Sequence, residues 1–261
     1  AGTDLTTGYY NVFAGMSAGQ NITIGNSNVI LGWQAGNNLT TTDNSIMIGY
    51  RAGYVDRGTN DYDIIIGYEA GLKVTGGSNV GIGRDALRGT GGSEFAAVST
   101  AAENTAVGYG AASLIIGSQT TAFGYQAGGA ATGSRGVYVG YRAGRGATSA
   151  PYGSGLYNTA IGYEALEDFT TGQQNTIIGY QAATALTTGN YNVVMGYAAL
   201  DTADGGESNN IAIGTNVMGH INHDDSDHNV AIGDSALLGG TGTVTKNVAI
   251  GSNAMGTGVG N

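Results

Sequence analysis

Apolar and polar positions recur along this chain with a step of 16 to 19 residues, interrupted by two longer steps. Each repeat contains a glycine that follows three mostly apolar residues, as in the segments that end at Gly162 and Gly179. Repetition at a fixed step of this length is typical of stacked structural units. We therefore predict an all-β protein, a parallel β-solenoid of about 14 coils. The central glycines of these coils are Gly15, Gly32, Gly49, Gly67, Gly83, Gly108, Gly124, Gly140, Gly162, Gly179, Gly196, Gly214, Gly233 and Gly251.

The three residues before each central glycine predict a short β-strand. The first of the three is Val, Ile or Thr in every unit, and the third is apolar in every unit. This spacing of two favours one buried face, so we expect Thr159 and Ile161 to face the interior. The middle residue is also often apolar, which indicates a strand covered on both faces, with another subunit against the second one. The rest of each unit predicts a second short strand and a turn, and the segments 21–25 and 114–117 are interpreted as second strands.

Three further positions of the unit have a structural interpretation. The central glycine ends the strand at a sharp turn, where it tolerates a positive φ or a close backbone neighbour. Asparagine stands four residues before this glycine in ten units and predicts a hydrogen-bonded ladder of side-chain amides along the stack. Alanine stands three residues after the glycine in thirteen units and predicts a narrow interior. The ladder and turn residues singled out are Asn158, Asn175, Asn192, Gly162, Gly179 and Gly196.

Insertions interrupt the repeat near residues 56–62, 89–103, 145–157 and 218–228. In solenoids such insertions emerge as loops on one side, and loops carry recognition. We interpret residues 1–261 as a single repeat domain and, because the array starts and stops within a unit, as a segment of a longer fibre. The candidate binding residues in the loops are Glu94, Phe95, Pro151, Tyr152, His220, His223 and His228.

The last of these loops holds all three histidines of the chain beside several aspartates. Imidazole and carboxylate groups this close together can hold a divalent cation, while the alternative interpretation is a solvated polar loop. We predict no other cofactor. The candidate metal ligands are His220, His223, Asp225, Asp227 and His228.

Composition narrows the classes of partner. The net charge of −10, with nine Lys and Arg residues, gives no electrostatic attraction to phosphate backbones, so nucleic acid is excluded as a partner. The chain contains no run of about 18 apolar residues, so we predict that it does not insert into a membrane. The absence of cysteine excludes disulfides and thiolate metal sites. Charged residues make up only 11% of the chain, so Asn, Thr, Ser, Gln and backbone groups must supply its polar surface.

The core of the repeat, as in Asn158–Gly162, resembles the head repeats of YadA-like trimeric autotransporter adhesins. Its extension Gly-Tyr-x-Ala-Leu, with Thr-Thr-Gly linkers, resembles related repeats of bacterial surface fibres and phage tail fibres. The resemblance extends from Asn11 to Met255. It implies a left-handed β-roll, a homotrimer wound round a three-fold axis and an extracellular fibre. It also implies adhesion or host recognition rather than catalysis.

Three classes of function follow. The first is a non-enzymatic fibre or adhesin segment that binds a cell-surface glycan or a protein receptor. The second is the structural shaft of a phage tail fibre whose binding tip lies elsewhere. The third is a polysaccharide-cleaving trimer, which needs a carboxylate pair in a groove between subunits. Because no unit repeats such a pair, we expect no enzyme, and the nearest acidic cluster is Glu164, Glu167 and Asp168.

Two other patterns have competing interpretations. An aromatic residue follows the central glycine in nine units, and such a row of rings either binds sugar rings or packs between subunits with its hydroxyls at the rim, which we favour. Ser17 lies in a Gly-x-Ser-x-Gly sequence that matches a hydrolase nucleophile turn. The same slot holds Gln34 and Arg51 in the next two units, so the repeat itself explains this match.

Overall fold

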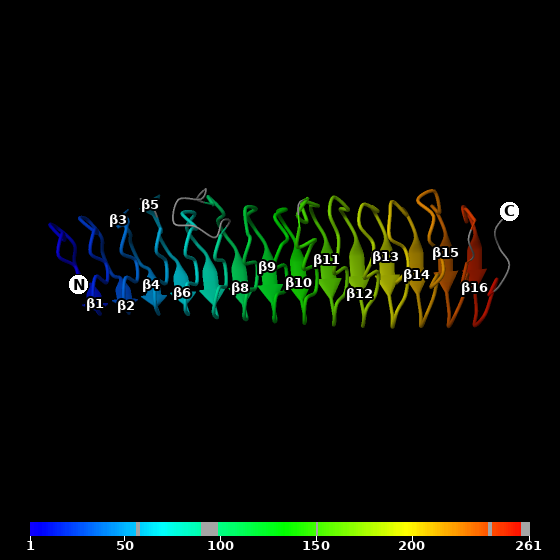
Figure 1. Cartoon of the computed structure of the whole chain (residues 1–261), viewed down its shortest axis with the longest axis horizontal. Helices are drawn as coiled ribbons and strands as arrows, with labels where there is room; N and C mark the ends of the chain where they lie inside the picture. The colour runs from blue at the N-terminus through cyan, green and yellow to red at the C-terminus, as the bar shows by residue number, and fades with distance from the viewer. Residues whose placement is uncertain (56–57, 90–98, 150, 240–241, 257–261) are drawn as a thin grey trace. The chain divides into compact units, whose positions relative to one another are not determined.

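The computed structural model describes residues 1–55, 58–89, 99–149, 151–239 and 242–256. These residues divide into two compact units, Ala1–Gly129 and Ala130–Asn261, and no helix occurs among them. Each unit is a parallel β-solenoid in which one strand of each coil lies beside the corresponding strand of the next (Figure 1). A helix capable of crossing a membrane is accordingly absent from the described residues.

The strand predicted before each central glycine is present, with the predicted bounds, throughout the part of the chain that the structure describes. Neighbouring strands pair in parallel without a shift, so that Thr159 lies opposite Thr176 and Thr176 opposite Val193. The first unit contains β1 (Val12–Ala14), β2 (Val29–Leu31), β4 (Ile46–Ile48), β6 (Ile64–Ile66), β7 (Val80–Ile82), β8 (Thr105–Val107) and β9 (Thr121–Phe123). The second unit contains β10 (Val137–Val139), β11 (Thr159–Ile161), β12 (Thr176–Ile178), β13 (Val193–Met195), β14 (Ile211–Ile213), β15 (Val230–Ile232) and β16 (Val248–Ile250).

The prediction of a second strand in each coil is wrong for most of the described coils. A second sheet contains only β3 (Leu39–Thr41) and β5 (Gly58–Thr59), on the far side of the coil from the main strands (Figure 1). The segments 21–25 and 114–117 form no strand, although Ile24 makes a single bridge to Thr41. Successive coils are still joined by backbone hydrogen bonds on this side, as in the 2.8 Å hydrogen bond from Thr170 N to Thr187 O. These hydrogen bonds join the coils without forming a regular strand in most of the described coils.

The strand residue that faces the interior is the middle one of the three. Ala160 and Ile177 are fully buried, whereas Ile161 is 37% exposed. The expectation that Thr159 and Ile161 face inward is therefore wrong. A two-residue period shows which residues share a face, but it does not show which face is the inner one. The first and third residues of each main strand instead form what we call the outer apolar face.

Small residues fill the interior at the turn that follows each strand. The alanine three residues after the central glycine is fully buried in nearly every described coil, as at Ala165 and Ala182, which confirms the narrow interior. The central glycine itself has a positive φ, and at Gly179 this angle is 145°. A Cβ built on Gly179 would overlap the carbonyl oxygen of Gly196 in the next coil. Both predicted reasons for glycine, its φ and the close neighbour, are confirmed.

Each coil also contains non-glycine residues in the left-handed region, which the sequence did not reveal. Gln181, Ala183 and Tyr191 have φ values of 49°, 46° and 60°. This conformation costs an L-residue about 1–2 kcal/mol. The cost is offset because each residue turns its N–H toward a carbonyl of an adjacent coil. The donor–acceptor distances are 2.8, 2.9 and 3.2 Å, to the carbonyls of Tyr163, Ala199 and Gln173.

The asparagine ladder is confirmed. Asn175 donates its backbone N–H and its side-chain amide to Oδ1 of Asn158, at 3.0 and 3.1 Å. The same amide also donates to the carbonyl of Gly189 at 2.9 Å. Asn192 repeats this arrangement against Asn175. All three side chains are buried, and a buried polar group that lacks a partner costs about 1–3 kcal/mol, so the ladder makes their burial possible.

The ladder is interrupted where its slot holds another residue. At Gly136 the missing side chain makes room for Tyr138, because a Cβ on Gly136 would overlap the tyrosine ring. Tyr138 is fully buried, and its ring centroid lies 6.1 Å from that of Phe169. An aromatic ring thus fills the interior that other coils fill with alanine or an aliphatic residue. The other interrupted slots hold Ser45, Asp63 and Thr120.

Candidate functional site

The predicted recognition loops are described in part. Glu94 and Phe95 lie outside the described residues. Pro151 and Tyr152 lie in the connection between β10 and β11, where both are exposed and the tyrosine retains 40% of its accessible surface. An exposed proline and an exposed tyrosine side by side give this loop an apolar contact surface.

The histidine-containing loop connects β14 to β15. The ring nitrogens of His223 lie 3.4 Å from the hydroxyl of Thr243. Asp227 accepts a 2.6 Å hydrogen bond from the backbone N–H of Ser208, while Asp225 donates its own backbone N–H to His223. The hydrogen bonds of His223 and Asp227 are thus made to different residues. The metal site predicted for this loop stays a prediction. The exposed members of the predicted set are His220, His223, Asp225 and His228.

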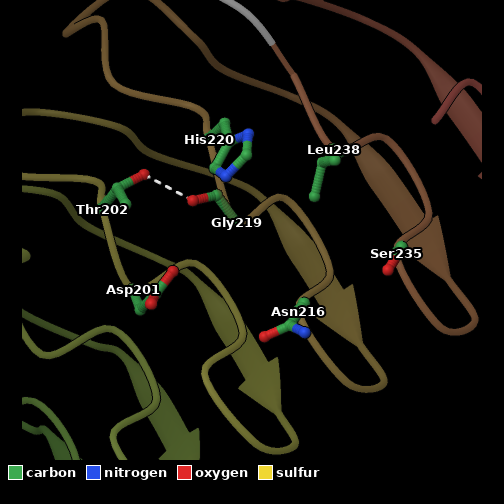
Figure 2. A pocket seen from close by; sticks show the side chains of 7 residues that line it. All are labelled: Asp201, Thr202, Asn216, Gly219, His220, Ser235 and Leu238. Carbon is green, nitrogen blue, oxygen red and sulfur yellow. Dashed lines mark hydrogen bonds between the residues drawn. The ribbon is translucent and has the colours of Figure 1, made fainter. Parts of the chain in front are cut away.

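A shallow polar pocket of about 360 Å³ lies beside this loop. Figure 2 shows its residues arranged around Gly219, with His220 and Leu238 on one side and Asp201 and Asn216 on the other. The hydroxyl of Thr202 donates to the carbonyl of Gly219 at 2.8 Å and joins two successive coils. The pocket is lined by Asp201, Thr202, Asn216, Gly219, His220, Ser235 and Leu238.

The electrostatics of the pocket depend on one acid and one imidazole. Burial raises the pKa of Asp201, while backbone hydrogen bonds and the nearby His220 act in the opposite direction. A carboxylate, an imidazole, an amide and hydroxyls around so small a volume can hydrogen-bond a compact polar group, such as a sugar hydroxyl pair. Sequence reasoning found His220 but missed Asp201 and Asn216. The available signal was the acidic segment 201–207, which replaces the usual Thr-Thr-Gly linker.

The aromatic residues that follow the central glycines form stacked columns within each unit. Tyr163 and Tyr180 have ring centroids 5.0 Å apart and planes within 9° of each other. Tyr180 and Tyr197 stack at 5.2 Å. Successive rings cover each other's faces within the column, where edges and hydroxyls are exposed, while an end ring such as Tyr197 has a stacked ring on one face only. The geometry therefore favours packing of the ring edges against another surface.

The acidic cluster considered for catalysis is an ion-pair network. Arg145 Nη2 lies 3.0 Å from Glu167 Oε1 and 2.8 Å from Asp168 Oδ1. Arg142 Nη1 lies 3.5 Å from Glu167 and 3.9 Å from Glu164. Burial raises the pKa of Glu167, and Arg145 opposes this shift most strongly. The network joins the coil of β10 to the coil of β11, so a structural role accounts for these carboxylates.

Ser17, the residue that matches a nucleophile turn in the sequence, is a turn residue of the repeat. It lies in the turn after β1 with a φ of 58°, in the left-handed slot that Gln34 and Arg51 occupy in the next two coils. Its carbonyl accepts a hydrogen bond from the Asn37 amide. A turn residue that recurs in every coil is explained by the repeat, as the sequence indicated.

Comparisons of the chain with protein-family models, with curated proteins and with solved structures found no significant match.

Proposed function

We propose that this chain is a non-enzymatic segment of an extracellular homotrimeric fibre, a left-handed β-roll that attaches to a cell-surface glycan or protein receptor. The observation that carries the proposal is the outer apolar face. Parallel sheets are ordinarily covered on both faces, and here the interior of the coil covers only one. The open face needs a partner surface of the same length and character, which a second copy of the chain supplies.

The outer apolar face holds aliphatic residues, methionine, phenylalanine or alanine at most of its positions and threonine at four of them, Thr105, Thr121, Thr159 and Thr176. None of its positions in the main strands holds a charged residue, although the chain carries a net charge of −10. Ile161, Met195 and Ile232 keep 37%, 39% and 37% of their surface exposed. Contiguous exposed apolar surface of this kind marks interaction sites. The tyrosine columns begin two residues after each strand, so their ring edges can extend the same interface and keep the hydroxyls at its rim.

Attachment through loops fits this architecture. The main strands and their turns are engaged in stacking, whereas Tyr152 and His223 lie exposed in insertions between them. Three chains would present each loop three times, and multivalent display turns weak contacts into firm attachment. The polar pocket beside His220 gives the loop region a place for a sugar hydroxyl group.

Light scattering under native conditions is expected to give three times the mass of one chain. A variant that carries Ile161→Lys and Met195→Lys should give a lower mass, because each lysine would have to bury an unpaired charge in the interface. Gln174→Lys is the matched control, since Gln174 is exposed and the same slot holds Lys246 in another coil. A monomeric mass for the unaltered protein would refute the trimer.

The attachment role predicts binding of the protein, immobilised on beads, to at least one surface in a panel of glycans and extracellular matrix proteins. Tyr152→Ser combined with His223→Ser should weaken this binding at least about tenfold, as loss of a contact hot spot does. Gln174→Lys again serves as the control. Absence of binding across the panel would contradict attachment and favour the structural shaft, and equal binding by the loop variant would contradict recognition through these loops.

A further inference from the structure

Three acidic side chains from two successive coils converge on either side of β14. Asp204 and Glu207 lie in the connection from β13 to β14, and Asp224 lies in the connection from β14 to β15. One carboxylate oxygen from each residue lies within 4.8 Å of the other two. This cluster is separate from the polar pocket around Gly219, and none of its members belongs to the histidine-containing set predicted from the sequence.

Glu207 is the central member of the cluster. Its side chain has no exposed surface, and its Oε1 atom is buried without a hydrogen-bond partner. Its Oε2 atom accepts a 3.2 Å hydrogen bond from the backbone N–H of Gly205. A buried carboxylate oxygen without a donor is costly, and a cation at that oxygen would remove the cost.

Asp224 is held against the same turn by the backbone. Its Oδ1 atom accepts a 3.2 Å hydrogen bond from the N–H of Gly206. A Cβ built on Gly205 would overlap the Asp224 carboxylate, so only a glycine at this position lets the aspartate approach Glu207. The turn 204–207 is therefore shaped around a carboxylate that comes from the next coil.

The charge balance distinguishes this cluster from the ion-pair network of Glu164, Glu167 and Asp168. Arg142 and Arg145 neutralise that network, whereas no salt bridge in the described part of the chain reaches Asp204, Glu207 or Asp224. Burial raises the pKa of Glu207, and Asp224 and Asp204 add to the shift by repulsion, against the opposing effect of backbone hydrogen bonds. The cluster thus has no positive partner among the described residues.

We propose that Asp204, Glu207 and Asp224 bind a calcium ion that ties two successive coils together. The ligands are all carboxylate oxygens, which suit hard cations rather than zinc or copper. Calcium bonds of 2.3–2.6 Å span ligand oxygens up to ~5 Å apart, whereas the 2.0–2.1 Å bonds of magnesium span only ~4 Å. Asp204 and Asp224 are exposed, so water completes the coordination.

The test is thermal unfolding of the chelator-treated protein, followed by circular dichroism, with and without added calcium chloride. Calcium at about a hundredfold above its Kd should raise the Tm by about 5–10 °C, because it binds only the folded chain. Glu207→Gln should abolish this shift. In chelator the same variant should be at least as stable as the unaltered protein, because the substitution removes a repelled buried charge.

Asp168→Asn is the matched control, since it also removes one acidic charge but belongs to the arginine-paired network, and it should keep the calcium shift. The proposal is overturned if about 10 mM calcium, tenfold above the weakest class of extracellular calcium modules, gives no shift in the unaltered protein. It is also overturned if Glu207→Gln retains the full shift, which would place the ion elsewhere, or if magnesium gives an equal shift.

Discussion

Gly179→Ala is expected to lower the free energy of unfolding by about 4 kcal/mol or more, the range reserved for strain and overpacking that the structure cannot relieve. The added Cβ would overlap the carbonyl oxygen of Gly196 in the next coil, and the φ of 145° is unfavourable for any L-residue. Backbone atoms cannot move aside as a flexible side chain does, so the two coils would have to separate. Chemical denaturation followed by circular dichroism measures the loss.

Gly110→Ala is the matched control for this prediction. Gly110 also has a positive φ, 60°, but the nearest atom to a Cβ there is the Gln126 Cγ at 3.5 Å. The same slot holds Ala198 with a φ of 47° in another coil, which shows that alanine fits. The control should lower the free energy of unfolding by no more than about 1–2 kcal/mol, the cost of an L-residue in the left-handed region. Equal effects of the two substitutions would contradict the close approach of successive central glycines.

Asp63→Asn is expected to make the protein more stable at about pH 8, by up to ~4 kcal/mol, and to change little at about pH 4. Asp63 occupies a slot of the asparagine ladder. Its Oδ1 accepts a 2.7 Å hydrogen bond from the N–H of Asn79, but its Oδ2 is buried without a partner. Burial raises the pKa of Asp63 from 3.8 to about 7. Asparagine keeps the acceptor and removes the charge.

The sign follows from the two protonation states. Below pH 3.8 the carboxyl is protonated in both the folded and the unfolded chain. As the pH rises toward 7, the unfolded chain ionises first, so the free energy of unfolding falls and then levels off above pH 7. Denaturation of both proteins across this range isolates the contribution of Asp63, since other acids contribute equally to each. Parallel pH profiles would show that Asp63 is not the group responsible.

The sequence predicted the positions of the main strands because glycine at the turn is a strict requirement. Any other residue at Gly179 would collide with the next coil, so the glycine marks the coil in the sequence as well as in space. The orientation of the strand was not predictable in this way. Thr159 and Ile161 look like core residues, but Ala160 between them is fully buried and Ile161 is 37% exposed. A period of two shows which residues share a face and leaves the choice of the inner face open.

The asparagine ladder was predictable, whereas the left-handed slots were not. An amide that must serve two neighbours leaves asparagine as the best choice at Asn175, and the residue identity reveals the role. At Gln181 and Ala183 the backbone N–H makes the hydrogen bond to the neighbouring coil, so the identity of the side chain does not reveal the left-handed conformation.

The sequence did not predict the candidate calcium site, because the alignment of residues between successive coils is not visible in it. The metal site predicted from the sequence used the histidine-containing segment 218–228 and did not include Asp224, which is adjacent to His223 and Asp225. Its partner Glu207 lies 17 residues earlier and becomes a neighbour only once the coils are stacked with the insertion in place. The length of the insertion determines which residue of the loop meets the previous coil, and a repeat pattern does not show how an insertion folds.

The aromatic column of the first unit has a spectroscopic consequence. Trp33, the one tryptophan of the chain, stacks on Tyr50 at 4.9 Å, and Tyr50 stacks on Tyr68 at 4.8 Å. At such separations excited tyrosines transfer their energy to the indole, so tyrosine excitation should yield tryptophan emission from residues 1–129. The column from Tyr141 to Tyr197 has no tryptophan within its own unit and should emit as tyrosine. Thermal unfolding of the two units can thus be followed separately, by tryptophan emission for the first unit and by tyrosine emission for the second.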